Sequence, residues 1–223
     1  MKEFELKDTD SEDIDDTLRK VESSFDIEFT DDELFHLKTF GELCDHIINK
    51  IQLVHSDDCT SQQAFYKLRK TITQSLHISP EVITPETTLA SILPSNNRRS
   101  RIKDMEMILD FKLHILRPPY WVFITLLILS VVSLAGLFIK SPISLAGLAL
   151  SISGFWLAFK TANVLSLQTV GELTEKITRE NYLKSRRNPK TFNKHEVEKV
   201  LIDLFSDDLG INKSKLTREA TFK

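Results

Sequence analysis

The dominant pattern in the chain is a pair of long stretches without charged residues, 120–139 and 141–159, separated only by Lys140. At about 1.5 Å per residue, each stretch is roughly 30 Å long as a helix, which matches the hydrocarbon thickness of a bilayer. The first stretch lies too far from the N-terminus to be a signal peptide. The rest of the chain is too short to bury two helices that are apolar on every face. The pattern therefore predicts a transmembrane hairpin over residues 119–160, with a tight loop at residues 140–142.

The residues that flank the two stretches indicate the orientation of this hairpin. Basic residues are concentrated on the outer sides, whereas the short loop carries one lysine. By the positive-inside rule, both termini are then cytoplasmic, in a bacterial inner membrane. The expected membrane-interface residues are Arg98, Arg99, Arg101, Lys103, Arg117, Tyr120, Trp121, Trp156 and Lys160, and the basic flank continues with Lys176, Arg179, Lys184, Arg186 and Arg187. Neither stretch contains Asp, Glu, Arg or His, so we expect an anchor rather than a transporter.

Outside the hairpin, apolar residues recur at helical spacing and strand patterns are weak. The predicted amphipathic helices cover residues 12–25, 39–51, 65–76 and 193–209. A capping box formed by Thr30 and Glu33 predicts a further short helical segment. Because such small amphipathic helices must bury their apolar faces against one another, the predicted fold class is all-α, with helical bundles beside the transmembrane hairpin.

The chain also contains an internal repeat. Similar residues recur at an offset of 130, and further along at an offset of 133. The first set includes the Gly-Glu-Leu runs at 41–43 and 171–173, and the second includes the Thr-x-Glu-x-Thr runs at 84–88 and 217–221. We interpret the soluble parts as a diverged duplication in which the helix that precedes Phe155 has become a membrane span.

Two runs of the first copy, Phe25-Asp26-Ile27-Glu28-Phe29-Thr30-Asp31-Asp32-Glu33 and Leu37-Lys38-Thr39-Phe40-Gly41-Glu42-Leu43, resemble the second half of an acyl carrier protein. Residues 62–89 and again residues 193–222 are similar to the first helix of that family and the long loop after it. The resemblance implies diverged, duplicated carrier-like bundles in a permuted order, because the chain starts with the later helices and ends with the first.

The order of these segments leaves more than one way to complete the bundles. The two ends of the chain could join into one permuted bundle, while residues 62–110 and 164–182 form a second. Alternatively, residues 11–94 could pack contiguously, which we prefer because its connections are short. The expected domains are therefore an acidic carrier-like bundle (1–94), a basic juxtamembrane segment (95–118), the hairpin (119–160) and a partial second repeat (161–223).

The resemblance also implies one candidate attachment site. Carrier proteins bear 4'-phosphopantetheine on a serine in an Asp-Ser-Leu motif, and Asp10-Ser11 lies 14 residues ahead of Phe25, at the family's spacing. Glu12 stands where the family has leucine, and no loop of the family's kind precedes the serine. The alternative is that Ser11 caps the helix that begins near Glu12. We expect no bound cofactor, and phosphopantetheine on Ser11 is the alternative.

Charge is distributed unevenly along the chain. Residues 1–60 carry 18 acidic and 6 basic residues, whereas residues 61–223 carry 14 acidic and 23 basic ones. The acidic residues at the predicted helix start are Asp10, Glu12, Asp13, Asp15 and Asp16. They suit the helix dipole and could simply be a solvated face. The alternative is a docking surface for a protein partner with a basic surface, which carrier proteins also use.

Other kinds of site receive little support from the sequence. Cys44 and His46 point in opposed directions on a helix, so they and the nearby His55 and Cys59 do not predict a zinc site, and we expect no metal. The two cysteines should stay reduced in a cytoplasmic location. The basic runs lack an aromatic platform, so we expect no nucleic acid. No catalytic motif stands out, and we expect no enzymatic activity.

These observations favour a bacterial inner-membrane protein that presents carrier-like helical domains in the cytoplasm and acts by binding, as an adaptor. Its expected partners are the lipid bilayer and a protein with a basic surface. A membrane-tethered acyl carrier modified with phosphopantetheine is one alternative. A membrane-bound immunity protein, whose acidic surface neutralises a cognate toxin, is another.

Overall fold

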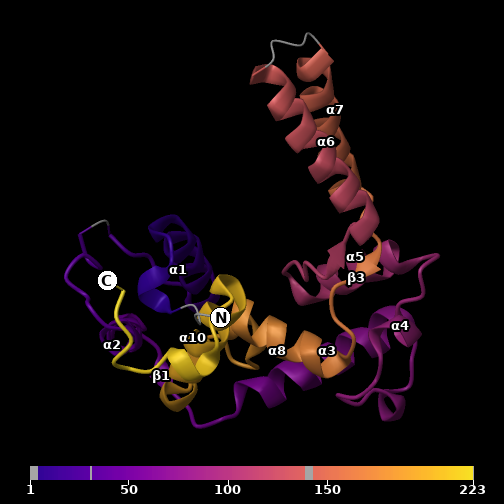
Figure 1. The fold of residues 1–223 in the computed structure, drawn as a ribbon. Coiled ribbons are helices and arrows are strands. Elements are labelled where there is room, and N and C mark those ends of the chain that lie inside the picture. Colours follow the sequence, from indigo (N-terminus) through magenta and orange to yellow (C-terminus); the bar gives the residue numbers. More distant parts are fainter. Residues whose placement is uncertain (1–4, 31, 139–142, 223) are drawn as a thin grey trace.

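The computed structural model describes residues 5–30, 32–138 and 143–222, most of them in helices (Figure 1). The predicted all-α class is confirmed. Within these residues the strands form two short pairs. Strand β1 (Val54–His55) lies parallel to β4 (Thr191–Phe192), and β2 (Leu116–Arg117) lies antiparallel to β3 (Val164–Leu165). The expected loop at residues 140–142 falls outside the described residues.

The helices follow one another along the chain, and the longest connection, residues 26–39, lies between α1 and α2. They are η1 (Leu6–Asp8), α1 (Ser11–Phe25), α2 (Phe40–Lys50), α3 (Thr60–Leu76), η2 (Pro80–Val82), α4 (Leu89–Ile92), α5 (Arg98–Leu109), α6 (Tyr120–Phe138), α7 (Ile143–Lys160), α8 (Val170–Glu180), α9 (Tyr182–Ser185), α10 (Lys194–Leu209) and η3 (Lys213–Lys215). The segment after Thr30 forms hydrogen-bonded turns, so the predicted short helix there is wrong. The Glu33 carboxylate still accepts the Thr30 N–H, at 3.1 Å, but no helical turn continues from it.

In the described residues outside α6 and α7, two separate hydrophobic cores hold the helices together. The first core joins α1 and α2 to α9, α10 and the C-terminal loop, and we call this unit, residues 5–55 with 182–222, the outer module. Phe25 and Phe40 from the beginning of the chain pack there with Phe205 from near its end, and the rings of Phe40 and Phe205 meet edge to face at 5.2 Å.

The second core lies between segments from the middle of the chain. It joins α3, α4 and α5 to α8, and we call this unit, residues 60–117 with 164–180, the inner module. Ile72 and Met105 are buried there against Leu173. The outer module therefore encloses the inner module along the sequence.

This arrangement corrects the expected domain boundaries. The sequence favours a contiguous bundle over 11–94, within a domain of 1–94, followed by a partial repeat over 161–223. The cores divide each of those ranges between the two modules. Closing a longer loop costs little additional entropy, because that cost grows only with the logarithm of loop length. The complementary apolar faces therefore decide the partners.

The internal repeat recurs as a repeated hydrogen-bond pattern. In the outer module, the Gly41 N–H donates to the Arg218 carbonyl at 2.9 Å; in the inner module, the Gly171 N–H donates to the Pro85 carbonyl at 2.8 Å. The bridges Thr39–Thr221 and Thr88–Thr169 are related by the same two offsets, 130 and 133. Each module thus pairs the start of one helix (α2 or α8) with the loop that follows another (α10 or α3).

These contacts explain the glycine in both Gly-Glu-Leu runs. A Cβ atom added to Gly41 would lie 2.8 Å from the Arg218 carbonyl oxygen, and one added to Gly171 would lie 3.1 Å from that of Pro85. Thr39 and Thr169 cap the two helices by accepting the N–H of the glutamate three residues later. The repeated sequence therefore encodes a repeated close approach between a helix start and a loop.

Helices α6 and α7 form a pair that packs side by side and projects away from both modules (Figure 1). Both are long and apolar enough to cross a membrane, and only 6% and 11% of their most apolar windows are buried. Their contact uses small residues, since Gly147 faces Ser133 and Gly136 faces Ser144. The chain leaves the inner module after β2, forms the α6–α7 pair and returns at β3. Because β2 pairs with β3, the two connections lie side by side.

Candidate functional site

The acidic start of α1 lies exposed on the surface of the outer module. Asp10 is the N-cap, because its carboxylate accepts the Glu12 N–H at 3.1 Å. The suggested capping role of Ser11 is therefore wrong: Ser11 is the first helical residue, with an exposed side chain. The Ser11 hydroxyl is therefore accessible from solvent, and it takes no part in the capping hydrogen bond.

The remaining carboxylates of this cluster lie along the outer side of α1. Glu12, Asp13, Asp15 and Asp16 are all exposed, and Asp16 forms an ion pair with Arg19 at 3.6 Å. Exposed pairs of this kind contribute little to stability. The cluster therefore leaves a negatively charged surface that can attract a basic partner over a range set by ionic strength.

The foot of the α6–α7 pair gathers the expected aromatic and basic residues. Tyr120, Trp121 and Trp156 are exposed, and the Lys160 ammonium group lies 4.4 Å from the centre of the Trp156 ring. Inside the pair, Phe123 packs edge to face against a phenylalanine of α7, so the aromatic ends of the two helices do lie together. Arg117, in β2, is also exposed.

Arginines of α5 fasten this foot to the inner module. The Arg99 guanidinium donates to the Lys160 carbonyl at the end of α7, at 2.6 Å, and the Arg98 guanidinium donates to the Asn163 carbonyl. Arg101 donates to the Ile92 carbonyl at 2.7 Å. Such donors satisfy carbonyl groups that a helix end or a loop leaves without partners. The sequence predicts these arginines at the membrane interface but does not predict these hydrogen bonds.

Arg186 is not the exposed basic residue that the sequence predicts after the second span. Its side chain is fully buried and donates to the carbonyl of Asp58 at 3.2 Å and to the Thr60 hydroxyl. The Glu196 carboxylate lies 4.0 Å from Arg186 and accepts the Thr60 N–H at 3.1 Å. This cluster joins the start of α3, in the inner module, to α9 and α10 of the outer module.

Tyr182 completes the same cluster. Its hydroxyl accepts the Asn193 N–H at 2.9 Å, and burial raises the pKa of the phenol. Tyr182 and Arg186 are four residues apart, about one helical turn. This spacing is the signal in the sequence that indicates a shared face of the helix. Because the donors of the buried Arg186 guanidinium are occupied, this group holds chain segments in place. It does not act as an acid or a base.

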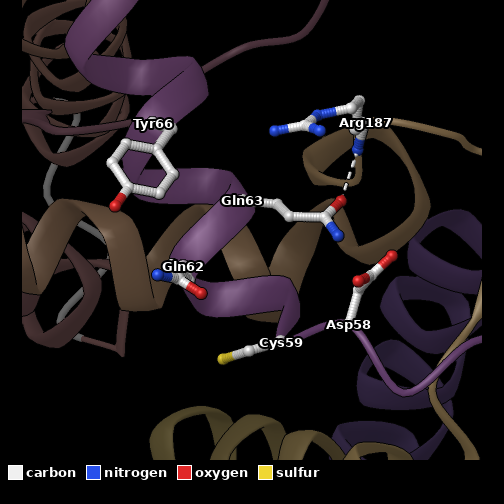
Figure 2. A pocket seen from close by; sticks show the side chains of 6 residues that line it. All are labelled: Asp58, Cys59, Gln62, Gln63, Tyr66 and Arg187. Carbon is white, nitrogen blue, oxygen red and sulfur yellow. Dashed lines mark hydrogen bonds between the residues drawn. The ribbon is translucent and has the colours of Figure 1, made fainter.

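A polar pocket of about 160 Å³ opens beside this cluster, between the first turns of α3 and the segment after α9 (Figure 2). Its lining residues are Asp58, Cys59, Gln62, Gln63, Tyr66 and Arg187. The Gln63 side-chain oxygen accepts the Arg187 N–H at 2.6 Å, which closes one side. Cys59 is exposed here, whereas burial raises the pKa of the Cys44 thiol to about 12.

The four residues considered for zinc do not converge on one point. Among the described residues, the group with metal-ligand geometry is His55, Asp57 and His195, all exposed, with ligand atoms within 4.8 Å of one another. His55 Nδ1 accepts the Lys194 N–H at 3.3 Å, which leaves the proton on Nε2, facing Asp57 at 3.0 Å. A metal at Nε2 would displace that proton and break the Lys194 bond, so we interpret the group as a hydrogen-bonded cluster at the start of α10.

Comparison with protein-family models, curated proteins and solved structures finds no match for this chain. The resemblance to acyl carrier proteins therefore stays a prediction that rests on the sequence.

Proposed function

We propose that this is a membrane-anchored, non-enzymatic binding protein of a bacterial inner membrane. The α6–α7 pair spans the bilayer as a hairpin, and both modules lie in the cytoplasm. The observation that carries the proposal is the exposure of the pair: helices with almost no buried surface and no charged residue before Lys160 need a nonpolar surrounding. Burial of apolar surface contributes about 25 cal/mol per Å², which favours insertion strongly over contact with water.

The orientation is supported by charge at the foot of the pair. Arg117 and Lys160 border the two spans at the end that carries the modules, and the arginines of α5 add to them. Cytoplasmic loops are enriched in such residues. Reporter fusions at both termini should therefore show cytoplasmic activity, and a fusion within residues 139–142 should show periplasmic activity. A periplasmic reporter at both termini would refute the proposed orientation, and one at a single terminus would refute the hairpin.

The exposed acidic start of α1 is the surface that we assign to partner binding. Charge reversal of Asp13, Asp15 and Asp16 to lysine should slow association with a basic partner, and high salt should reduce the difference because screening shortens the range of attraction. A matched control reverses Glu28, Asp32 and Glu219, exposed acidic residues outside α1. Equal recovery of the same partners with both variants would show that the α1 face is only solvated.

A membrane-tethered acyl carrier is the second candidate, and one observation favours it: Ser11 is exposed at the first turn of α1, next to the Asp10 cap. Because Glu12 removes the apolar neighbour that the carrier motif requires, we expect intact-mass measurement of protein from its native host to show no phosphopantetheine. An added mass that disappears with Ser11→Ala, but persists with Ser23→Ala in the same helix, would establish the carrier function instead.

A further inference from the structure

The inner module has a helix in the position that α1 occupies in the outer module, and its charge is opposite. The repeat relates α10 to α3, and α10 packs against α1 whereas α3 packs against α5. Val21 and Phe25 of α1 fill one core in the way that Met105 and Leu109 of α5 fill the other. Where α1 exposes carboxylates, α5 exposes Arg99 and Lys103, with Asp104 partly buried beside them, so the two modules present different chemistry from equivalent positions.

The exposed side of α5 is a stripe that begins at the foot of the α6–α7 pair. Ile102, Met105 and Leu109 are buried against the inner-module core, so the opposite side of the helix faces away from it. Arg99, Lys103 and Met107 follow one another at four-residue spacing along that free side. We call these three residues the α5 stripe.

One end of the α5 stripe touches the pair directly. The Arg99 guanidinium donates to the Lys160 carbonyl at the end of α7, and α5 lies at the foot of the pair (Figure 1). Met107, at the other end, is 67% exposed, and the neighbouring Ile108 is 45% exposed. Basic side chains attract anionic lipid headgroups, and an exposed apolar side chain near them can enter the boundary between headgroups and acyl chains.

We propose that the α5 stripe binds the surface of the bilayer, with Arg99 and Lys103 on anionic lipid headgroups and Met107 at the boundary with the acyl chains. This inference rests on the proposed membrane anchoring and adds a lipid preference to it. Its basis is the continuity of the stripe with the foot of the pair and the complementarity between its cations and anionic phosphates. The stripe then holds the inner module against the membrane and leaves the acidic α1 face of the outer module for a partner.

The test uses the full chain in nanodiscs of phosphatidylcholine, with or without 30% phosphatidylglycerol. Cys59 is replaced by serine, Cys44 is protected by its raised pKa and burial, and a bimane dye is attached at Met107→Cys. We expect a blue-shifted emission and at least a twofold loss of iodide quenching when phosphatidylglycerol is present. Lys103→Glu should remove that difference, whereas Lys199→Glu, the same charge change at an exposed position of α10, should preserve it.

The outcomes separate this inference from the anchoring proposal. A dye that is equally quenched in both lipids, on protein that resists alkaline extraction from vesicles, would overturn the α5 stripe and leave the anchor intact. Protein that alkaline extraction removes would overturn the anchor itself. Equal protection of the dye in both lipids would overturn the preference for anionic lipid. A dye at Ser23→Cys, in α1, should stay quenched throughout.

Discussion

Glu33 lies in hydrogen-bonded turns where its sequence context predicts a short helix. Its carboxylate accepts hydrogen bonds from Lys50 at 2.6 and 2.7 Å and lies 2.7 Å from the His46 ring. The Lys50 ammonium, followed by the Thr30 N–H and His46, lowers the pKa of Glu33 to about 2. The Glu33 carboxylate therefore ties the turns after Thr30 to α2.

This pKa makes the stability of the outer module depend on acid. The folded state favours the Glu33 carboxylate, so its contribution is complete above pH 4.5 and is lost as the pH falls from 4.5 towards 2. We expect Glu33→Gln to flatten the fall of the thermal unfolding midpoint across this range, as measured by circular dichroism in detergent. Glu28→Gln, at an exposed position in the same segment, serves as the control. An unchanged slope in the Glu33 variant would contradict the prediction.

The close contact at Gly41 leads to a second prediction for a single residue. Gly41→Ala would place a methyl group 2.8 Å from the Arg218 carbonyl oxygen, so the loop must move. We expect a loss of about 1–3 kcal/mol, typical of overpacking, seen as faster hydrogen exchange in α2. Gly210→Asn is the control, since nothing lies near a Cβ there and asparagine tolerates the left-handed conformation of Gly210. Equal exchange in α2 of both variants would argue against the close contact.

At the scale of elements, α6 and α7 pair through small residues. Ser133, Ser144 and Ser151 are the buried residues of these helices within the described part of the chain. A Cβ atom on Gly147 would collide with the Ser133 hydroxyl. Because lipid is as apolar as leucine, close backbone approach rather than hydrophobicity holds such a pair together.

Gly147→Leu should therefore separate the two helices. We expect slower migration in SDS gels, where a compact helix pair runs ahead of an extended one, and a lower thermal midpoint in mild detergent. Ala146→Leu is a matched control, because Ala146 is exposed in the same turn of α7. If both variants migrate like the parent protein, the small-residue contact does not hold the pair.

At the scale of the whole molecule, the chain is nested: the outer module encloses the inner module, which encloses the α6–α7 pair. The pairing of β2 with β3, supported by the Ser166 N–H on the Ile115 carbonyl at 2.9 Å, brings the ends of the insertion together. Insertions whose ends are adjacent can be removed with little effect on the host fold.

Replacement of residues 119–162 by Asn-Gly should thus give a protein that stays in solution without detergent. The two added residues form the turn that favours a short antiparallel connection. We expect a helical circular dichroism spectrum and one cooperative thermal transition, because both cores remain complete. Aggregation, or a broad transition without cooperativity, would show that the α6–α7 pair is required for folding of the inner module.

The sequence by itself determined the helical class, the two apolar helices and the repeat, because each depends on local spacing or on composition. The preferred contiguous bundle failed, since the choice between α3 and α10 as the partner of α2 depends on matching apolar faces far apart in the chain. The burial of Arg186 could not be predicted for a related reason. Its partners at residues 56–60 lie more than 120 residues away, and only tertiary packing places their carbonyls around a charge that would otherwise stay in water.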